Sequence, residues 1–262
     1  MTAPEELERR SGRASLLAKE GGSASGLLVF AAALLREQGR VATAVLALQA
    51  RGPFSGEAGE DLPRFASLFG GFLDALAPAC PDDLRDEVLS RARAGETGLL
   101  EQLTSFWDGG ASTGDFLVRA FLRPCLEASS EAGCSLARPS SEGSCPRCGG
   151  PPSLAVRRPQ EGSEAGERFL FCPLCGFEFR FSRIRCPGCL EESPAALPHF
   201  QSDRYPGVRV EACDSCRRYV KSLDLTLDAR PVPEIDDLVS VAVDLWAQEQ
   251  GYARLEPGLA GM

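Results

Sequence analysis

Eight of the eleven cysteines in this 262-residue chain form four Cys-x-x-Cys pairs, and their spacing constrains the fold more than any other feature. Twenty-three residues separate the first pair from the second, and the third from the fourth, whereas ten separate the second from the third. Adding 41 to each cysteine number of the first two pairs gives the cysteines of the last two. The pattern indicates an internal duplication of one cysteine-bearing unit.

A Cys-x-x-Cys turn directs two sulfur atoms toward one point, so two such turns together make a tetrahedral site for zinc or iron. Twenty-three residues are enough for a strand, a loop and a returning strand that brings the second turn against the first. The spacing therefore predicts two sites built from consecutive pairs: Cys145, Cys148, Cys172 and Cys175 for one metal ion, and Cys186, Cys189, Cys213 and Cys216 for another. A cross-paired site of Cys172, Cys175, Cys186 and Cys189 is sterically possible but breaks the repeat.

The other candidate groups give no sign of catalysis. Cys80, Cys125 and Cys134 are isolated, which is typical of small apolar core residues. The single histidine, His199, is interpreted as a polar residue on a hairpin because eight cysteines already complete two sites. The acidic pairs Glu191/Glu192 and Asp236/Asp237 are expected on the surface or at a helix start. With no phosphate-binding loop and no acid–base constellation, the chain reads as a protein that is not an enzyme.

Charge and the amino terminus bear on location and partners. The first residues carry charges of both signs and no apolar segment with a cleavage site, and the run Gly26–Leu35 is too short to cross a bilayer, so a cytoplasmic protein without membrane insertion is expected. Residues 139–230 hold 13 Lys+Arg and 12 Asp+Glu, a net charge of +1, so the remainder carries −10 and the whole chain −9. No basic surplus favours non-specific nucleic-acid binding.

Hydrophobic periodicity divides the chain. Apolar residues recur every three or four positions up to about residue 130, which predicts helices over 25–50 (one helix, or two joined near Gly39), 63–77 after an Asp61 cap, 82–95, 98–109 and 113–129. Alternating segments at 152–158, 168–172, 176–185, 208–213 and 217–225 predict strands, and the strand at 176–185 should lead from one cysteine unit into the next. A last apolar stripe comprises Ile235, Leu238, Val239, Ala242, Leu245 and Trp246.

Together these patterns predict a multidomain α+β protein. An all-α helical domain (1–130) is followed by a linker (131–144), a first four-cysteine metal module (145–182), a second four-cysteine metal module (183–230), and a carboxy-terminal helix and tail (231–262). The two β modules are expected to be tandem rubredoxin-like or zinc-ribbon units. Such small modules have little core of their own, so a closed site of four cysteines is most often structural.

The four cysteine motifs, the segment CDSCRRYVKSLDL and the following PVPEIDDLVSVAVDLWAQEQGY resemble the FdhE-type formate dehydrogenase accessory proteins. Weaker similarity lies in RSGRASLLAKE, LLVFAAALLREQ and FLRPCLEA. The resemblance implies a cytoplasmic maturation factor that binds the catalytic subunit of a molybdenum- or tungsten-dependent formate dehydrogenase. It also implies iron bound by the eight paired cysteines, and it matches Tyr219 and Lys221 to family positions after the fourth pair. The third pair reads CPGCLEE and lacks the family's glycine after its second cysteine.

Two further hypotheses remain open from the sequence. A rubredoxin-like site could transfer electrons or sense oxygen, which requires iron. Alternatively, Arg180, Arg183 and Arg185 beside Phe179 and Phe181 could form a strand on which nucleic-acid bases stack, although ordinary packing and ion pairing explain the same residues. The sequence distinguishes neither zinc from iron nor a monomer from an oligomer.

Overall fold

The computed structural model describes residues 1–109, 115–138, 140–160 and 163–261. The chain divides into two compact units, Met1–Pro139 and Ser140–Met262, each considered by itself. The first is helical and the second contains a mixed sheet with both cysteine clusters, so the predicted α+β class is confirmed. Among the described residues, no helix combines the length and the apolar character that crossing a bilayer requires.

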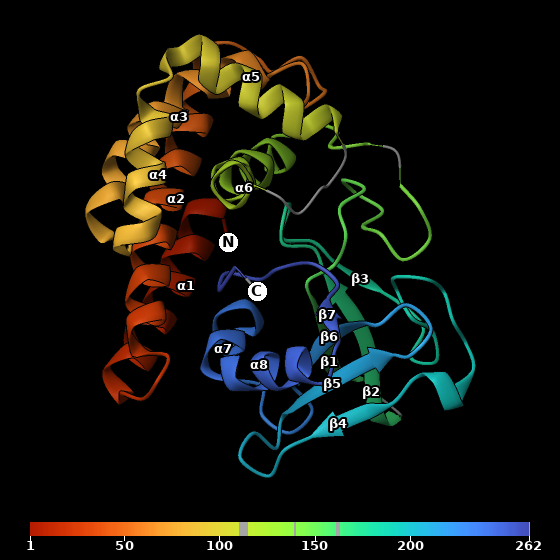
Figure 1. Cartoon of the computed structure of the whole chain (residues 1–262). Coiled ribbons are helices and arrows are strands. Elements are labelled where there is room, and N and C mark those ends of the chain that lie inside the picture. Colours follow the sequence, from red (N-terminus) through yellow and green to blue (C-terminus); the bar gives the residue numbers. More distant parts are fainter. Residues whose placement is uncertain (110–114, 139, 161–162, 262) are drawn as a thin grey trace. The chain divides into compact units, whose positions relative to one another are not determined.

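The first unit is built from helices (Figure 1). Helix α2 runs unbroken through Gly39, so the predicted segment 25–50 is one helix and not two. Helix α6 starts at Phe116 because the Asp115 carboxylate accepts a hydrogen bond from the backbone N–H of Val118. The first two residues of the predicted helix at 113–129 lie outside the described part of the chain. The helices are α1 (Ala3–Glu20), α2 (Ser25–Arg51), α3 (Leu62–Leu76), the 3-10 turn η1 (Ala77–Ala79), α4 (Asp82–Ala92), α5 (Gly95–Asp108) and α6 (Phe116–Glu131).

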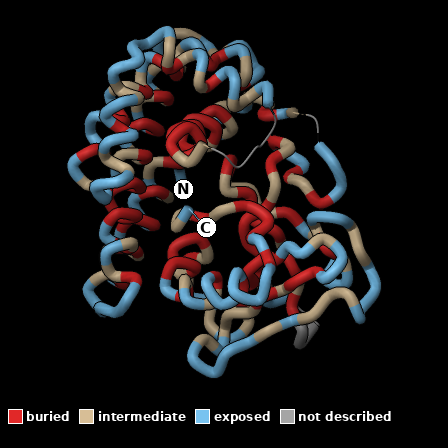
Figure 2. Tube along the Cα trace, viewed as in Figure 1, coloured by how far each residue is buried: buried red, intermediate tan, exposed pale blue. Residues whose placement is uncertain are grey.

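Aromatic rings of α3 and α6 pack together in the core of this unit. The rings of Phe69 and Phe121 stack with centroids 4.4 Å apart, and Phe72 lies 5.6 Å from Phe121. Helix α6 is buried over most of its length (Figure 2), including the side chains of Arg119 and Arg123. Asp61 is the N-cap residue of α3 as predicted, but its carboxylate makes no capping bond and instead accepts hydrogen bonds from the backbone N–H and hydroxyl of Ser55.

In the second unit the described strands form one seven-stranded sheet in the order β3-β2-β1-β6-β5-β4, with β7 also paired to β6. The duplication is visible in the register: Phe171 lies opposite Glu178 in β2–β3, and Ala212 lies opposite Tyr219 in β5–β6, each number higher by 41. The strands are β1 (Leu154–Gln160), β2 (Ser163–Phe171), β3 (Glu178–Arg180), β4 (His199–Gln201), β5 (Val208–Cys213), β6 (Arg218–Asp224) and β7 (Ala253–Arg254).

The two repeats are joined by parallel pairing of β1 with β6, from Leu154 opposite Lys221 to Arg157 opposite Asp224. An ion pair of 2.8 Å between the Arg157 guanidinium and the Asp224 carboxylate reinforces the joint. The prediction of a strand through 176–185 was wrong beyond Arg180, because the chain turns there into the third cysteine pair. The short strands β4 and β7 carry no alternating pattern long enough to predict.

The predicted carboxy-terminal helix is two short helices, α7 (Pro233–Val239) and α8 (Val241–Glu249), that break at Ser240. The break rotates the predicted apolar stripe, so that Leu245 is 49% exposed and Trp246 36% exposed. The buried positions of these helices instead include Asp237 and Asp244. A 3-10 turn, η2 (Pro194–Ala196), precedes β4.

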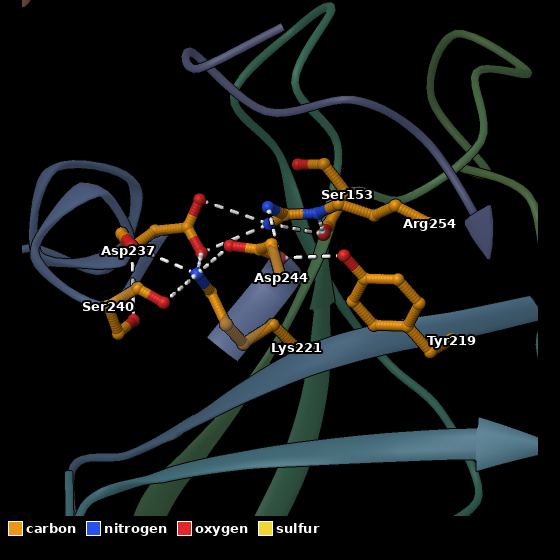
Figure 3. A network of polar contacts seen from close by, with 7 residues as sticks. All are labelled: Ser153, Tyr219, Lys221, Asp237, Ser240, Asp244 and Arg254. Atoms are coloured by element: carbon orange, nitrogen blue, oxygen red, sulfur yellow. Dashed lines mark hydrogen bonds and ion pairs between the residues drawn. The ribbon is translucent and has the colours of Figure 1, made fainter. Parts of the chain in front are cut away.

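Buried charged groups connect α7 and α8 to the sheet (Figure 3). Lys221 of β6 contacts both Asp237, at 2.8 Å, and Asp244, while Arg254 of β7 contacts the same two carboxylates at 3.0 and 3.1 Å. Tyr219 donates its hydroxyl hydrogen to Asp244 at 2.8 Å. Burial by itself opposes ionisation of Asp237, but the charges of Arg254 and Lys221 outweigh it and hold the pKa of this carboxyl below its ordinary value.

An apolar cluster lies beside these charges. It fills the space between β5, β6 and α8, and its members are Val210, Ala212, Tyr219, Ala247 and Tyr252, with Phe200 and Val243 packed against them. Trp246 closes the edge of the cluster with its ring centroid 4.9 Å from that of Phe200. Helices α7 and α8 are therefore attached to the sheet by apolar packing and by ion pairs between two cations and two carboxylates.

Replacing Lys221 with methionine should destabilise the second unit by about 3–5 kcal/mol, because two buried carboxylates would then share one cation. The measurement is a urea titration of the whole chain, followed by near-ultraviolet circular dichroism. The matched control is Arg230→Met, which removes an exposed ion pair with Asp228 and should leave the midpoint unchanged. Equal midpoints for the two variants would contradict the assigned role of the buried charges.

Candidate metal centres

The structure brings the eight paired cysteines together as two clusters, in the consecutive pairing that the spacing predicts. Within each cluster every sulfur lies within 4.8 Å of the others. The sulfur–sulfur distances are 3.6 Å for Cys145–Cys175 and 3.5 Å for Cys148–Cys172 in the first cluster. In the second they are 3.8 Å for Cys186–Cys216 and 3.6 Å for Cys189–Cys213. The cross-paired alternative is not formed.

These distances can be compared with what a metal ion needs. A tetrahedral ion with metal–sulfur bonds of about 2.3 Å separates its sulfur ligands by about 3.8 Å. The four sulfur–sulfur distances above match this edge length to within a few tenths of an ångström, so each donor set fits zinc or iron. Four cysteines complete a tetrahedron and leave no position for a substrate, which is the ligand arrangement of closed sites.

The first three pairs share one backbone turn, which we call the knuckle. In each, the N–H of the first cysteine donates to a carbonyl five residues later: Gly150 for Cys145, Phe177 for Cys172 and Glu191 for Cys186, at 2.8 to 3.0 Å. The N–H of the residue after the second cysteine returns a bond to the carbonyl of the first cysteine. Leu190 makes this bond at 2.9 Å, so the missing glycine of the third pair leaves the turn intact.

The residue that follows the second cysteine has a left-handed backbone at all four pairs. Gly149 and Gly176, in the first cluster, both have φ of 69°. In the second cluster the same position holds Leu190, at 66°, and Arg217, at 56°. Because a side chain costs about 1–2 kcal/mol in this conformation, the second site is built with strain that glycine removes from the first.

The two sites also differ in how far their cysteines are exposed to solvent. The four cysteines of the first cluster are at most 2% exposed. In the second, Cys186 and Cys213 are buried, Cys216 is partly exposed and Cys189 is exposed. The first knuckle is closed further by Arg147, whose guanidinium lies 4.2 Å above the ring of Phe177.

The carboxy-terminal segment covers one flank of the second site. A Cβ atom at Gly188 would lie 2.9 Å from Leu255 Cδ1, so Leu255 packs directly over this glycine. The N–H of Ala253 donates to the carbonyl of Arg217, at 2.9 Å, and the Arg217 guanidinium reaches the carbonyl of Gln250 at 2.7 Å. A separate contact links the third and fourth pairs, because the hydroxyl of Ser215 donates to the carboxylate of Glu191 at 2.7 Å.

The isolated cysteines and the histidine lie elsewhere. Cys80 and Cys125 are buried in the first unit, where burial raises the pKa of both thiols and makes them poor nucleophiles. Cys134 is partly exposed. His199 is exposed at the start of β4 and belongs to neither cluster.

The arginines considered for nucleic-acid binding are engaged within the second unit. Arg180 pairs with Glu167 at 2.6 Å, Arg183 donates to the carbonyl of Gly166, and Arg185 pairs with Glu142 and Glu192. Arg180 and Arg185 are therefore paired with acids, as the ordinary interpretation predicts, and Arg183 is bound to a backbone carbonyl.

The sequence placed Asp237 on the surface or at a helix start, and this was wrong: the residue is 2% exposed. Its neighbour Asp236 does lie at the start of α7, where it accepts from the N–H of Val232 at 2.7 Å. Asp244 and Arg254 were missed altogether. Tyr219 and Lys221, singled out by resemblance, bind these buried charged residues and no cysteine.

Comparisons with known proteins agree with this geometry. Residues 144–183 match the family model "FdhE, central domain", and residues 184–259 match "FdhE, C-terminal domain". The boundary between the two models falls between the two cysteine clusters.

Individual relatives extend the similarity. A "Protein FdhE homolog" of Aquifex aeolicus is 31% identical over 203 residues, which cover 77% of this chain and 71% of that protein. A homolog from Pseudomonas aeruginosa is 39% identical over 119 residues, covering 44% of this chain and 38% of the relative. The crystal structure of the FdhE protein from Pseudomonas aeruginosa superimposes with a TM-score of 0.68 at 25% identity, over 98% of this chain and 95% of that one.

Substituting Cys172 with serine should reduce the metal content of purified protein from two ions per chain to one, because three thiols and a hydroxyl hold zinc or iron poorly. Inductively coupled plasma mass spectrometry on protein purified without oxygen measures this and names the metal. Cys134→Ser is the control and should retain two ions. Two ions in Cys172→Ser would show that the first cluster is not a metal site.

Proposed function

The chain belongs to the FdhE family, and on this premise we propose that it is a cytoplasmic accessory factor that binds the catalytic subunit of a formate dehydrogenase and assists its maturation. The observation that carries the proposal is the unbroken family match from residue 144 to residue 259, which includes both cysteine clusters. The similarity over 77% of the chain to the Aquifex relative extends it beyond the second unit.

The metal ions would act on the fold and not on a substrate. Four cysteines per ion close the coordination sphere, and the eight proposed ligands are Cys145, Cys148, Cys172, Cys175, Cys186, Cys189, Cys213 and Cys216. Bound iron or zinc supplies folding free energy by linking strands whose own apolar clusters are small, such as Leu154, Phe171 and Leu223. A rigid sheet of this kind can serve as a docking surface, and the proposal assigns the chain no reaction of its own.

Affinity purification tests whether the catalytic subunit of formate dehydrogenase is the protein's partner. Tagged protein from a host that also expresses the matching formate dehydrogenase should retain the catalytic subunit, most strongly when insertion of its cofactor is blocked. The control is a host without the dehydrogenase gene, and Cys134→Ser should behave as the wild type. Absence of the subunit at every stage of assembly would reject the proposed client.

A redox role is the second candidate, favoured by the rubredoxin-like knuckles and by a sulfur hydrogen bond at the exposed site. The N–H of Gly188 donates to the Sγ of Cys186 at 3.3 Å, an interaction that stabilises thiolate charge. This function requires iron and predicts visible absorption that bleaches and returns on reduction and reoxidation. Colourless protein with two zinc ions after anaerobic purification would reject it.

A further inference from the structure

The two cysteine clusters have the same ligands and similar sulfur distances, yet their surroundings differ in two independent ways. One is access, since Cys189 is exposed whereas the first cluster is closed to solvent. The other is backbone conformation, since Leu190 and Arg217 occupy left-handed positions that glycines occupy in the first cluster. Either difference alone favours loss of a ligand at the second site.

The contacts around the second site show where it can open. Leu255 packs over Gly188, and Arg217 is held by Gln250 and by the ring of Tyr252, which lies 4.0 Å from the guanidinium carbon. These contacts fix the flank that carries Cys186 and the fourth pair. On the other flank, Cys189 is exposed and is followed by the strained Leu190.

We propose that the second cluster is an exchangeable metal site whose ion leaves or accepts an outside ligand by release of Cys189, whereas the first cluster holds its ion permanently. The inference rests on the metal occupancy that the proposed function assumes. After release of Cys189, the ion would be held by Cys186, Cys213 and Cys216. An outside thiol would bind as a thiolate and give its proton to the freed Cys189 Sγ, so the exchange balances and no electron is transferred.

Selectivity for a thiolate follows from the remaining ligands. Three cysteine sulfurs stay on the ion after Cys189 leaves, and a fourth sulfur restores the tetrahedron that zinc and iron prefer with such ligands. The exposed side of the second site is thus the place where a cysteine of another protein, or a small thiol, could reach the metal. The first site offers no comparable approach.

The test follows zinc release from the full-length protein into the chromogenic chelator 4-(2-pyridylazo)resorcinol. Release should occur in two phases of one zinc each, with rates that differ by about tenfold or more, as strain of this size at Leu190 and Arg217 implies. Limited alkylation with iodoacetamide and peptide mass spectrometry should find Cys189 modified before any cysteine of the first cluster. A single phase for both ions, or earlier modification of the first cluster, would overturn the proposal.

Two variants assign the phases. Cys189→Ser should eliminate the fast phase and keep the slow one. Leu190→Gly relieves the left-handed strain and should slow the fast phase by about threefold or more while leaving the slow phase unchanged. An unaltered fast phase in Leu190→Gly would contradict the role of the backbone.

The reciprocal change is Gly149→Ala, which places a side chain at the left-handed position of the first cluster and should accelerate the slow phase only. Failure of the proposed metal binding gives a different result, because purified wild-type protein would then contain no stoichiometric metal to release. The two proposals therefore fail separately.

Discussion

In each repeat four sulfur atoms converge on one point, and the architecture of the second unit follows from this requirement. Two hairpin-like turns must face each other, so the strands that carry them are brought into one sheet with a fixed register. The register of β2 with β3 recurs in β5 with β6 because each pair of strands leads into and out of one cysteine pair, the second and the fourth. Metal geometry thus sets strand pairing that the modest apolar clusters would not specify alone.

The buried charges solve a different problem, the attachment of α7 and α8. Two carboxylates, one lysine and one arginine are removed from water together, and such an arrangement contributes less to stability than apolar packing of the same volume would. Its value lies in geometry: Lys221 reaches both Asp237 and Asp244, so the two helices on either side of the break at Ser240 have one permitted position on the sheet. Arg254 extends the same constraint to β7, and hence to the segment that covers the second cluster.

Much of this could be predicted from sequence because cysteine spacing and hydrophobic period are local signals. The consecutive pairing of the cysteines, the helical first unit and five of the strand regions were predicted on that basis. The parallel joint between β1 and β6 could not be, since it connects residues far apart in the chain and leaves no periodic trace. Asp237 and Asp244 were unpredictable for a related reason: a carboxylate on a short helix is ordinarily solvated, and only the tertiary position of Lys221 makes burial tolerable.

The way the repeats are joined has a consequence for the ends of the sheet. Strand β1 is the first strand of the first repeat and β6 is the last strand of the second, so the repeats are joined head-to-tail. The outer strands of the sheet are therefore β3, the last strand of the first repeat, and β4, the first strand of the second. An arrangement of this type does not close on itself and could in principle continue from molecule to molecule. Both outer strands are only three residues long, which offers an arriving strand few backbone partners. Because these edge strands are so short, the sheet ends within one molecule and does not extend into a neighbouring one.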